Sequence, residues 1–432
     1  MRKASQSLVV IGLDGTPYSF LKKEIEAGNL PNIADLTSGG HLGRIDSEIP
    51  TISSVAWASF MTGVNPGTHG IYGFTDRKPG TYELYFPNYN DIKVKPFWDT
   101  LSSEGRRCCV INVPSTYPAR ALNGILVSGF VAPNLERASY PREAYEYLNS
   151  IDYRVDVDAS KARESLDLLL EDLHLTLDKR RQAMLHFWEN EDWDFFMCVF
   201  TGTDRLHHFM WKHYEESAFA YASEFMRYYK RIDELVGEFV NLLPDSTSLF
   251  MLSDHGFCLI KSEVYLNNFL REIGLLSFKS DNPRSIADID PSKTKVYCMD
   301  PGRLYVNLKG REPGGIVDQS DYKKVIEEVT EAISQLKDPQ SGQSIVDHIY
   351  TRVDLYEGPC ADKSPDLVVS AVNGYDLKGF MDRNSSFGTT HLTGMHTFND
   401  AFLLQSKCDI NTEIKSIRQV AGSIKNIFNV NS

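Results

Sequence analysis

The 432-residue sequence lacks the features that would direct a chain to a membrane or to nucleic acid. No window approaches the roughly 18 consecutive apolar residues of a membrane span. No block of lysine and arginine stands out, and 45 basic against 58 acidic residues give a formal net charge of -13. We therefore expect neither a membrane nor a nucleic acid polymer among its partners. Internal repeats and low-complexity tracts are also missing, which argues against a solenoid or a linker-like chain.

Cysteine is sparse and scattered, at positions 108, 109, 198, 258, 298, 360 and 408, without a CxxC pair. An odd number of thiols, mostly in apolar runs, favours reduced, buried side chains over a disulfide framework and offers no thiolate zinc site. The N-terminal run in "MRKASQSLVVIGLDG" ends at Asp14 without a small-residue cleavage pattern, so it predicts a first strand rather than a signal peptide. We expect a cytoplasmic protein.

Four apolar runs have the composition of buried strands: "SLVVIGL", "RCCVINV", "WDFFMCVF" and "TSLFML". They alternate with helical patterns, including two long amphipathic segments near 161–190 and 217–243. This alternation predicts an α/β fold, an α/β/α sandwich with a mostly parallel central sheet.

The pattern changes to short mixed elements after residue 258 and returns to the core type at "PDLVVS". We predict a catalytic core of residues 1–258 and 366–432, with residues 259–365 as an inserted smaller subdomain. Residues 75–95 and 131–160 have weak periodicity and are predicted to be loops over one edge of the sheet. These loops and the insertion would set substrate specificity.

Acidic residues follow three of the predicted strands. Asp14 and Asp254 each end an apolar run, and Asp204 follows a third. A single such Asp is most simply a helix cap, but the carboxyl ends of parallel strands meet at one edge of a sheet, where ligands bind. His208 lies four residues after Asp204, on the same face of a helix, and His255 follows Asp254 directly. Three separate strand ends thus bring acids and imidazoles to one edge.

A further pair of histidines, His391 and His396, lies in a predicted loop near the end of the chain. Adding His396 gives six oxygen and nitrogen donors: Asp14, Asp204, Asp254, His208, His255 and His396. Six donors without cysteine predict two divalent ions, with zinc as the first choice and manganese or iron as alternatives. Two neighbouring ions suit phosphoryl transfer, because one activates the attacking oxygen and the other stabilises the leaving oxygen.

Two adjacent hydroxyls, Ser53 and Ser54, lie at the start of the predicted helix "SVAWASFMTG", which Ser53 would begin. Either hydroxyl could cap the helix, whose free N–H groups and dipole favour an anion such as a phosphoryl group. Metal coordination would also lower the pKa of a serine hydroxyl enough to make it a nucleophile. The sequence alone does not separate the two serines.

The pieces "GLDG", "PTISSVAWASFMTGVNPGTHGIYGF", "TGTDRLHHFMW", "SDHGF" and "GMHTFNDAF" resemble, in order, the alkaline phosphatase superfamily. The resemblance is closest to its type I phosphodiesterase/nucleotide pyrophosphatase branch, and to a group of predicted phosphohydrolases or phosphomutases. It implies an alkaline phosphatase-like fold with Ser53 as nucleophile and a phosphoseryl intermediate. It further implies that Asp14, Asp254 and His255 hold one metal with Ser53. Asp204, His208 and His396 would hold the other.

Three residues are candidates for substrate binding: Ser54 through its backbone N–H, Arg205 as an anion contact, and His391. Arg205 could equally be a solvated surface residue. Trp57, Phe60 and Trp211 could stack on a leaving group, but their helical spacing favours a place in the core. The region around Ser53 lacks the Pro and Arg of the sulfatase motif, which argues against sulfate ester cleavage.

The sequence therefore predicts a metal-dependent hydrolase of a phosphodiester or phosphoanhydride bond in a small soluble substrate, with a nucleotide among the candidates. A phosphomonoesterase or phosphomutase on the same two-metal core is the first alternative. It would need a further cationic contact for the extra charge of a monoester. A non-catalytic ligand-binding protein is the second alternative, but it would be expected to have lost at least one donor.

Overall fold

A computed structural model describes residues 6–216, 221–407 and 413–430, which form two compact units. The first unit contains the chain up to Val64, Asn88–Cys258 and the residues from His391 onwards. The second contains Asn65–Pro87 and Leu259–Thr390. The domain bounds expected from the sequence, with an insertion at 259–365, stay a prediction. Cys408 lies outside the described residues, and the six described cysteines form no disulfide with one another.

The first unit is built on an eight-stranded sheet in the order β2-β19-β9-β1-β8-β5-β6-β7. Strands β9, β1, β8, β5 and β6 run parallel, whereas β19 and β7 run antiparallel to them. The edge strand β2 pairs antiparallel with β19 and so has the direction of the five parallel strands. The four apolar runs are β1, β5, β8 and β9, and their residues are almost entirely buried because helices cover both faces. The strand bounds are β1 (Ser7–Leu13), β2 (Gly40–Ile45), β5 (Cys108–Val113), β6 (Gly124–Ser128), β7 (Ser139–Tyr140), β8 (Phe195–Phe200), β9 (Thr247–Leu252) and β19 (Ala401–Ser406).

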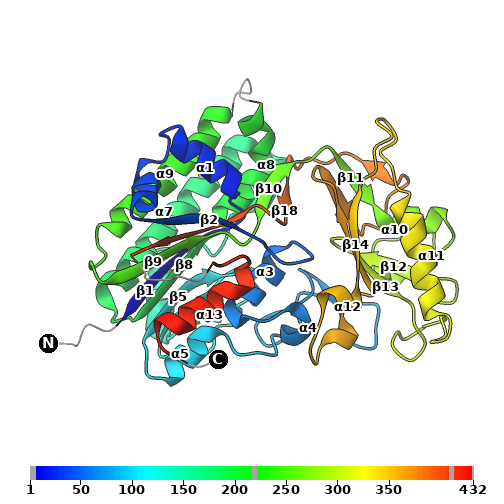
Figure 1. Ribbon diagram of the computed structural model, residues 1–432, viewed down its shortest axis with the longest axis horizontal. Coiled ribbons are helices and arrows are strands. Elements are labelled where there is room, and N and C mark those ends of the chain that lie inside the picture. The colour runs from blue at the N-terminus through cyan, green and yellow to red at the C-terminus, as the bar shows by residue number, and fades with distance from the viewer. Residues whose placement is uncertain (1–5, 217–220, 408–412, 431–432) are drawn as a thin grey trace. The chain divides into compact units, whose positions relative to one another are not determined.

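Helices form a layer on each side of this sheet (Figure 1). One layer contains α1 (Tyr18–Glu26), α2 (Pro31–Ser38), α7 (Leu166–Asn190), α8 (Gly202–Glu215) and α9 (Ala222–Val240). The other contains α3 (Ser53–Thr62), α5 (Phe97–Ser103) and α13 (Ile417–Ile427). The predicted α/β/α sandwich with a mostly parallel sheet is thereby confirmed.

Local signals set the ends of the long helices. The Ser165 hydroxyl accepts from the backbone N–H of Asp167 and starts α7, five residues later than expected, after the short 3-10 helix η1 (Ala159–Arg163). The predicted helix at 217–243 is α9, and residues 217–220 lie outside the described residues. The expectation of loop throughout 131–160 is wrong, because α6 (Arg142–Ser150) lies there with Ala144 and Leu148 buried.

The second unit has its own core around a four-stranded sheet in the order β12-β13-β15-β14. Apolar residues of α10 and α11 pack in the same core, and a three-stranded sheet β16-β11-β17 completes the unit. The main bounds are β11 (Ser262–Tyr265), α10 (Leu266–Glu272), β12 (Val296–Met299), β13 (Arg303–Val306), α11 (Tyr322–Ser334), β14 (Val346–Thr351), β15 (Leu367–Ala371), β16 (Tyr375–Lys378) and β17 (Phe387–Gly388). The short elements are α4 (Pro66–His69), β3 (Asp76–Arg77), β4 (Leu84–Tyr85), η2 (Ile286–Asp288), α12 (Arg352–Leu355) and η3 (Ala361–Lys363).

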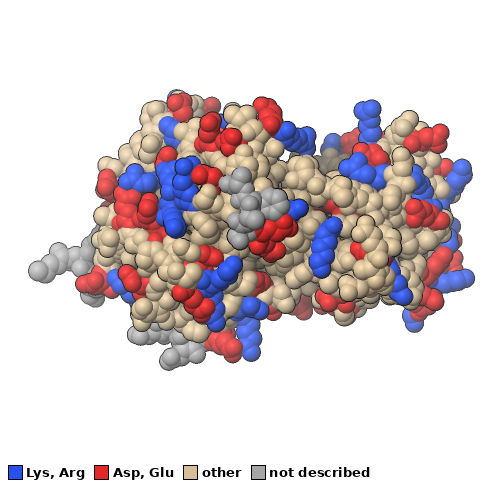
Figure 2. All heavy atoms as spheres, turned by 90° about the horizontal axis from the view of Figure 1, so that it is seen from above, with Lys and Arg blue, Asp and Glu red and all other residues tan. Residues whose placement is uncertain are grey.

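Within the described ranges, none of the helices combines the length and the apolar character needed to cross a membrane. On the face drawn in Figure 2, lysine and arginine side chains are interspersed with aspartate and glutamate. The charge of this face is therefore mixed rather than gathered into one area of a single sign.

Candidate metal centre

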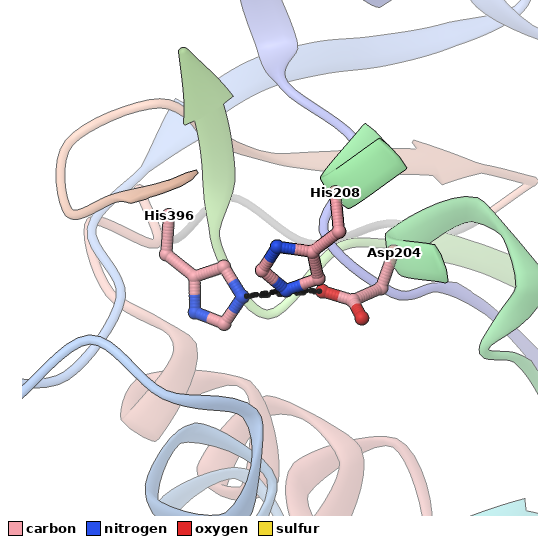
Figure 3. Close-up of side chains that lie close together, drawn as sticks. All are labelled: Asp204, His208 and His396. Carbon is pink, nitrogen blue, oxygen red and sulfur yellow. Dashed lines mark hydrogen bonds and ion pairs between the residues drawn. The ribbon is translucent and has the colours of Figure 1, made fainter. Parts of the chain in front are cut away.

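One group of donors combines helix α8 with the short strand β18 (Gly394–Thr397). Asp204 lies in the first turn of α8 and His208 one turn later, and both point toward His396 of β18 (Figure 3). The Nε2 atoms of His208 and His396 lie 3.1 Å apart. Asp204 Oδ1 lies 3.2 Å from His396 Nε2 and 3.4 Å from His208 Nε2. His396 was expected in a loop, whereas the structure pairs its segment with β10 (Gly256–Leu259) in a two-stranded sheet.

A second group lies at the carboxyl ends of β1 and β9. Asp14 follows β1, and Asp254 and His255 follow β9, with all three side chains buried. His255 Nε2 lies 3.4 Å from Asp254 Oδ2 and 3.7 Å from Asp14 Oδ1. Ser53 Oγ completes this group, 3.1 Å from His255 Nε2 and 3.2 Å from Asp14 Oδ1.

The main chain fixes the tautomer of all three histidines. The Nδ1 atom of His208 lies 3.0 Å from the carbonyl oxygen of Gly394, that of His396 3.1 Å from Thr51 O, and that of His255 3.1 Å from Gly256 O. A carbonyl oxygen only accepts, so each Nδ1 carries the proton and donates it. With Nδ1 donating to the main chain, the Nε2 atom of each ring faces the other donors, which is the orientation in which histidines bind metals.

The donor sets fit a divalent metal ion. Nitrogen and oxygen lone pairs held 3.1–3.4 Å apart repel each other unless a proton or a metal ion lies between them. Ligands about 2.0 Å from a tetrahedral zinc ion lie roughly 3.3 Å from one another, close to these separations. The buried Oδ2 of Asp254 has no hydrogen-bond partner among the described residues, which leaves it available as a ligand.

The two groups are neighbours. The imidazole rings of His255 and His396 stack with their centres 3.7 Å apart and link one group to the other. The charges of Asp14 and Asp204, which belong to different groups, also influence each other. Two cations bound here would therefore share one site.

Burial and neighbouring charges shift the pKa values of the donor residues. Burial and the neighbouring carboxylates raise the pKa of Asp14 well above its usual range, and burial raises the pKa of Asp254 to about 7. Burial lowers the pKa of His255 to about 4 and also lowers the pKa of His396. Burial favours the protonated form of Asp204 too, but His208, His396 and Arg205 outweigh it and hold its pKa well below the usual range.

Helix α3 begins at Ser53, as the sequence predicts, and its N-cap residue Ile52 offers no side-chain acceptor. The first intrahelical bonds run from the N–H groups of Val55 and Ala56 to Ile52 O. The N–H groups of Ser53 and Ser54 therefore come before the helical ladder, where an anion is favoured. The buried hydroxyl of Ser54 has no hydrogen-bond partner within the described ranges.

The other two substrate-binding candidates differ in their position: Arg205 lies beside the first donor group, and His391 lies outside both groups. Arg205 is only 18% exposed and forms ion pairs with Asp156 and Asp204. His391 is exposed and lies against the ring of Phe209, 5.8 Å between centres, in neither donor group.

Sequence reasoning missed the residues that orient the carboxylates. The indole N–H of Trp57 donates to Asp14 Oδ2 at 2.9 Å, and the N–H of Gly15 donates to Asp254 Oδ1 at 3.0 Å. Trp57 is also fully buried, so its predicted place in the core is confirmed, as it is for Phe60 and Trp211. A signal for Trp57 existed, since it follows Ser53 by one helical turn and shares its face.

An α/β/α sandwich with such donor groups at the carboxyl edge of its sheet places the protein in the alkaline phosphatase superfamily. The chain belongs to the type I phosphodiesterase/nucleotide pyrophosphatase family, whose model matches residues 8–399. The predicted resemblance is thus confirmed, and with it a place in a family of hydrolases.

Two solved structures are similar over nearly the whole chain. Phosphonoacetate hydrolase from Sinorhizobium meliloti, in complex with phosphonoacetate, has a TM-score of 0.66 at 16% identity, covering 98% of this chain and 96% of that one. Murine ectonucleotide pyrophosphatase/phosphodiesterase 5, in complex with AMP, has a TM-score of 0.59 at 12% identity, covering 99% of this chain and 96% of that one. At these identities the likeness concerns the fold.

Proposed function

We propose that the protein hydrolyses a phosphodiester or phosphoanhydride bond of a small substrate by way of a phosphoserine at Ser53. One observation carries the proposal. Two three-residue donor groups meet at the carboxyl edge of the sheet, and Ser53 Oγ lies within 3.2 Å of two donors of the second group. Divalent ions held there, zinc being the first choice, would supply the charge that activates the nucleophile and neutralises the phosphoryl group.

The reaction proceeds in two displacements. Ser53 Oγ loses its proton to solvent and attacks phosphorus, so that an Oγ–P bond forms. The bond from phosphorus to the leaving-group oxygen breaks, and that oxygen keeps the electron pair. Water then attacks the same phosphorus, the Oγ–P bond breaks, and a proton from water restores the Ser53 hydroxyl.

The chain contributes position and charge to these steps. Asp14 and His255 contact Ser53 Oγ and hold it at the start of α3, and Asp254 lies beside His255. The N–H groups of Ser53 and Ser54 would face a phosphoryl oxygen, because the helix dipole stabilises negative charge there. Asp204, His208 and His396 would hold the metal ion on the leaving-group side, the role that the family resemblance implies.

A small phosphate ester suits this family, and a nucleotide-like substrate is consistent with the AMP bound by the murine neighbour. The phosphonoacetate bound by the bacterial neighbour makes a phosphonate a second compound class to assay. A preference for a monoester would favour the phosphomonoesterase or phosphomutase alternative.

The proposal is tested with zinc-reconstituted protein and three chromogenic substrates: bis(p-nitrophenyl) phosphate, p-nitrophenyl phosphate and p-nitrophenyl sulfate. We expect the diester to be the best substrate and Ser53→Ala to lower kcat at least 1,000-fold, roughly 4 kcal/mol of transition-state stabilisation. Ser54→Ala is the matched control, since it removes a neighbouring hydroxyl and keeps the backbone N–H.

If Ser53→Ala is fully active and Ser54→Ala is inactive, Ser54 and not Ser53 is the nucleophile. Turnover that survives complete chelation would remove the metal-dependent mechanism. A phosphorylated peptide containing Ser53, trapped by acid quench and found by mass spectrometry, would support the covalent step independently of the rates.

A further inference from the structure

The buried carboxylate of Asp204 has two oxygens with different environments. Oδ1 faces the Nε2 atoms of His208 and His396. Oδ2 accepts a hydrogen bond of 2.7 Å from Nη1 of Arg205. Arg205 therefore takes up one oxygen and leaves the other to the donor group.

Arg205 is itself held by a residue far away in the sequence. Its Nη2 and Nε donate to Oδ2 of Asp156 at 2.7 and 3.2 Å, and its guanidinium carbon lies 4.8 Å from the centre of the Phe130 ring. The other oxygen of Asp156 accepts from the hydroxyl of Thr201, at 3.0 Å. Both ends of the Asp156 carboxylate are thus fixed, and the planar fork of Arg205 has one orientation.

We propose that Arg205 and Asp156 are positioning residues, which hold Asp204 so that a single oxygen, Oδ1, is presented to a metal ion bound with His208 and His396. The inference rests on the proposed metal site. It makes segment 151–158, which contributes Asp156, a determinant of metal affinity at one of the two donor groups and not at the other.

The arrangement explains why a cation lies beside a metal-binding carboxylate. Arg205 repels a nearby metal ion, but its charge also neutralises that of Asp156. By occupying Oδ2 of Asp204, it prevents that oxygen from taking up a proton or from coordinating the metal together with Oδ1. Three of its donor bonds go to these two carboxylates. A phosphoryl group would have to compete with them, which favours a positioning role over a direct substrate contact.

The test is zinc binding to the chelated full-length protein, followed by calorimetric titration without any substrate. We expect wild type to bind two ions. Arg205→Gln should weaken one of them 10- to 100-fold, the usual effect of losing an outer-shell partner, and leave the other unchanged. Arg205→Lys keeps the positive charge but loses the planar guanidinium. Its affinity for this ion should lie between those of wild type and Arg205→Gln. The same titration with Co²⁺ would show an altered visible spectrum for one ion only.

A double-mutant cycle tests the chain of contacts. If Asp156 acts through Arg205, Asp156→Asn weakens the same ion, and the double variant binds zinc no more weakly than Arg205→Gln alone. Arg418→Gln is the matched control. It breaks a different arginine–carboxylate pair, in which Arg418 donates to both oxygens of Glu48 at 2.9 Å, and should change the affinity for neither ion.

The outcomes separate the inference from the proposed function. If the wild-type protein binds no zinc, the proposed metal site itself is wrong. A wild type with two ions and an Arg205→Gln variant with unchanged affinities would overturn the positioning role alone. Unchanged zinc affinities with a raised KM for the diester would make Arg205 a substrate contact instead.

Discussion

Single residues decide which groups carry protons at the candidate metal centre. Burial raises the pKa of Asp254 to about 7 and lowers the pKa of His255 to about 4. Between these values the carboxyl is protonated and the imidazole is neutral. A metal ion arriving near pH 6 therefore displaces a proton from Asp254 and not from His255.

We expect zinc binding to release more protons at pH 6 than at pH 8, and the affinity for zinc to rise over this interval. The sign follows because Asp254 must lose its proton to bind below its pKa of about 7, whereas above it the carboxylate is already free. Calorimetric titration in two buffers of different ionisation enthalpy measures the release. In Asp254→Asn the excess at pH 6 should shrink. If the extra proton release at pH 6 persists in Asp254→Asn and disappears in His255→Ala, His255 and not Asp254 supplies the protons.

The six donors could be found from the sequence, because each lies at a strand end, one helical turn on, or in a short histidine motif. Of the residues that orient these donors, some could be predicted from the sequence and others could not. Trp57 shares a helix face with Ser53, which is a readable signal, but Asp156 reaches Arg205 from an aperiodic segment. A contact between residues so far apart depends on tertiary packing, which local sequence patterns do not record.

At the scale of elements, the short strand β18 brings His396 to helix α8. Gly394 begins this strand, and its carbonyl oxygen accepts from Nδ1 of His208. A β-carbon at Gly394 would lie 2.5 Å from the carbonyl oxygen of His207 and 2.9 Å from the ring of Phe257. Strand and helix can therefore approach this closely only through glycine.

Gly394→Ala should push β18 away from α8, cost about 1–3 kcal/mol of unfolding free energy, and weaken the zinc ion bound with His396. Urea unfolding and zinc titration measure the two effects. Gly422→Ala is the matched control, because a β-carbon at that position in α13 meets nothing within 4 Å. It should be neutral or stabilise the protein by about 0.5–1 kcal/mol. Equal losses in both variants would contradict the close-approach argument.

The elements differ in how far their sequences predict them. The parallel strands β1, β5, β8 and β9 are continuous apolar runs, buried on both faces, and could be predicted. Helix α6 buries only Ala144 and Leu148, and β18 has four residues, so neither shows a period long enough to recognise. Helix α6 and strand β18 form because packing against neighbouring elements stabilises them, and this packing leaves no periodic pattern in their own sequences.

At the scale of the whole molecule, all five tryptophans belong to the first unit: Trp57, Trp98, Trp188, Trp193 and Trp211. All six metal-donor candidates belong to it as well. The second unit has a separate apolar core and no tryptophan. Tryptophan fluorescence therefore reports on the unit that would bind metal, and circular dichroism reports on both.

Removing zinc with a chelator should lower the unfolding midpoint seen by tryptophan fluorescence and leave part of the circular dichroism transition in place. Zinc at 100 times its dissociation constant stabilises the folded unit by about 2.7 kcal/mol for each site. The fluorescence midpoint of Asp254→Asn should respond less to the chelator than that of wild type. If both signals shift together by the same amount, the two units unfold as one.

The histidines and two of the carboxylates are supported by different parts of the chain. Main-chain carbonyl oxygens hold Nδ1 of His208, His255 and His396, whereas the side chains of Trp57 and Arg205 hold Asp14 and Asp204. No substitution can delete a main-chain carbonyl, but either side chain can be exchanged in one mutational step. If the proposed metal site is occupied, the choice of metal would therefore be open to evolution and to engineering through the carboxylates, on a scaffold whose imidazoles keep their orientation.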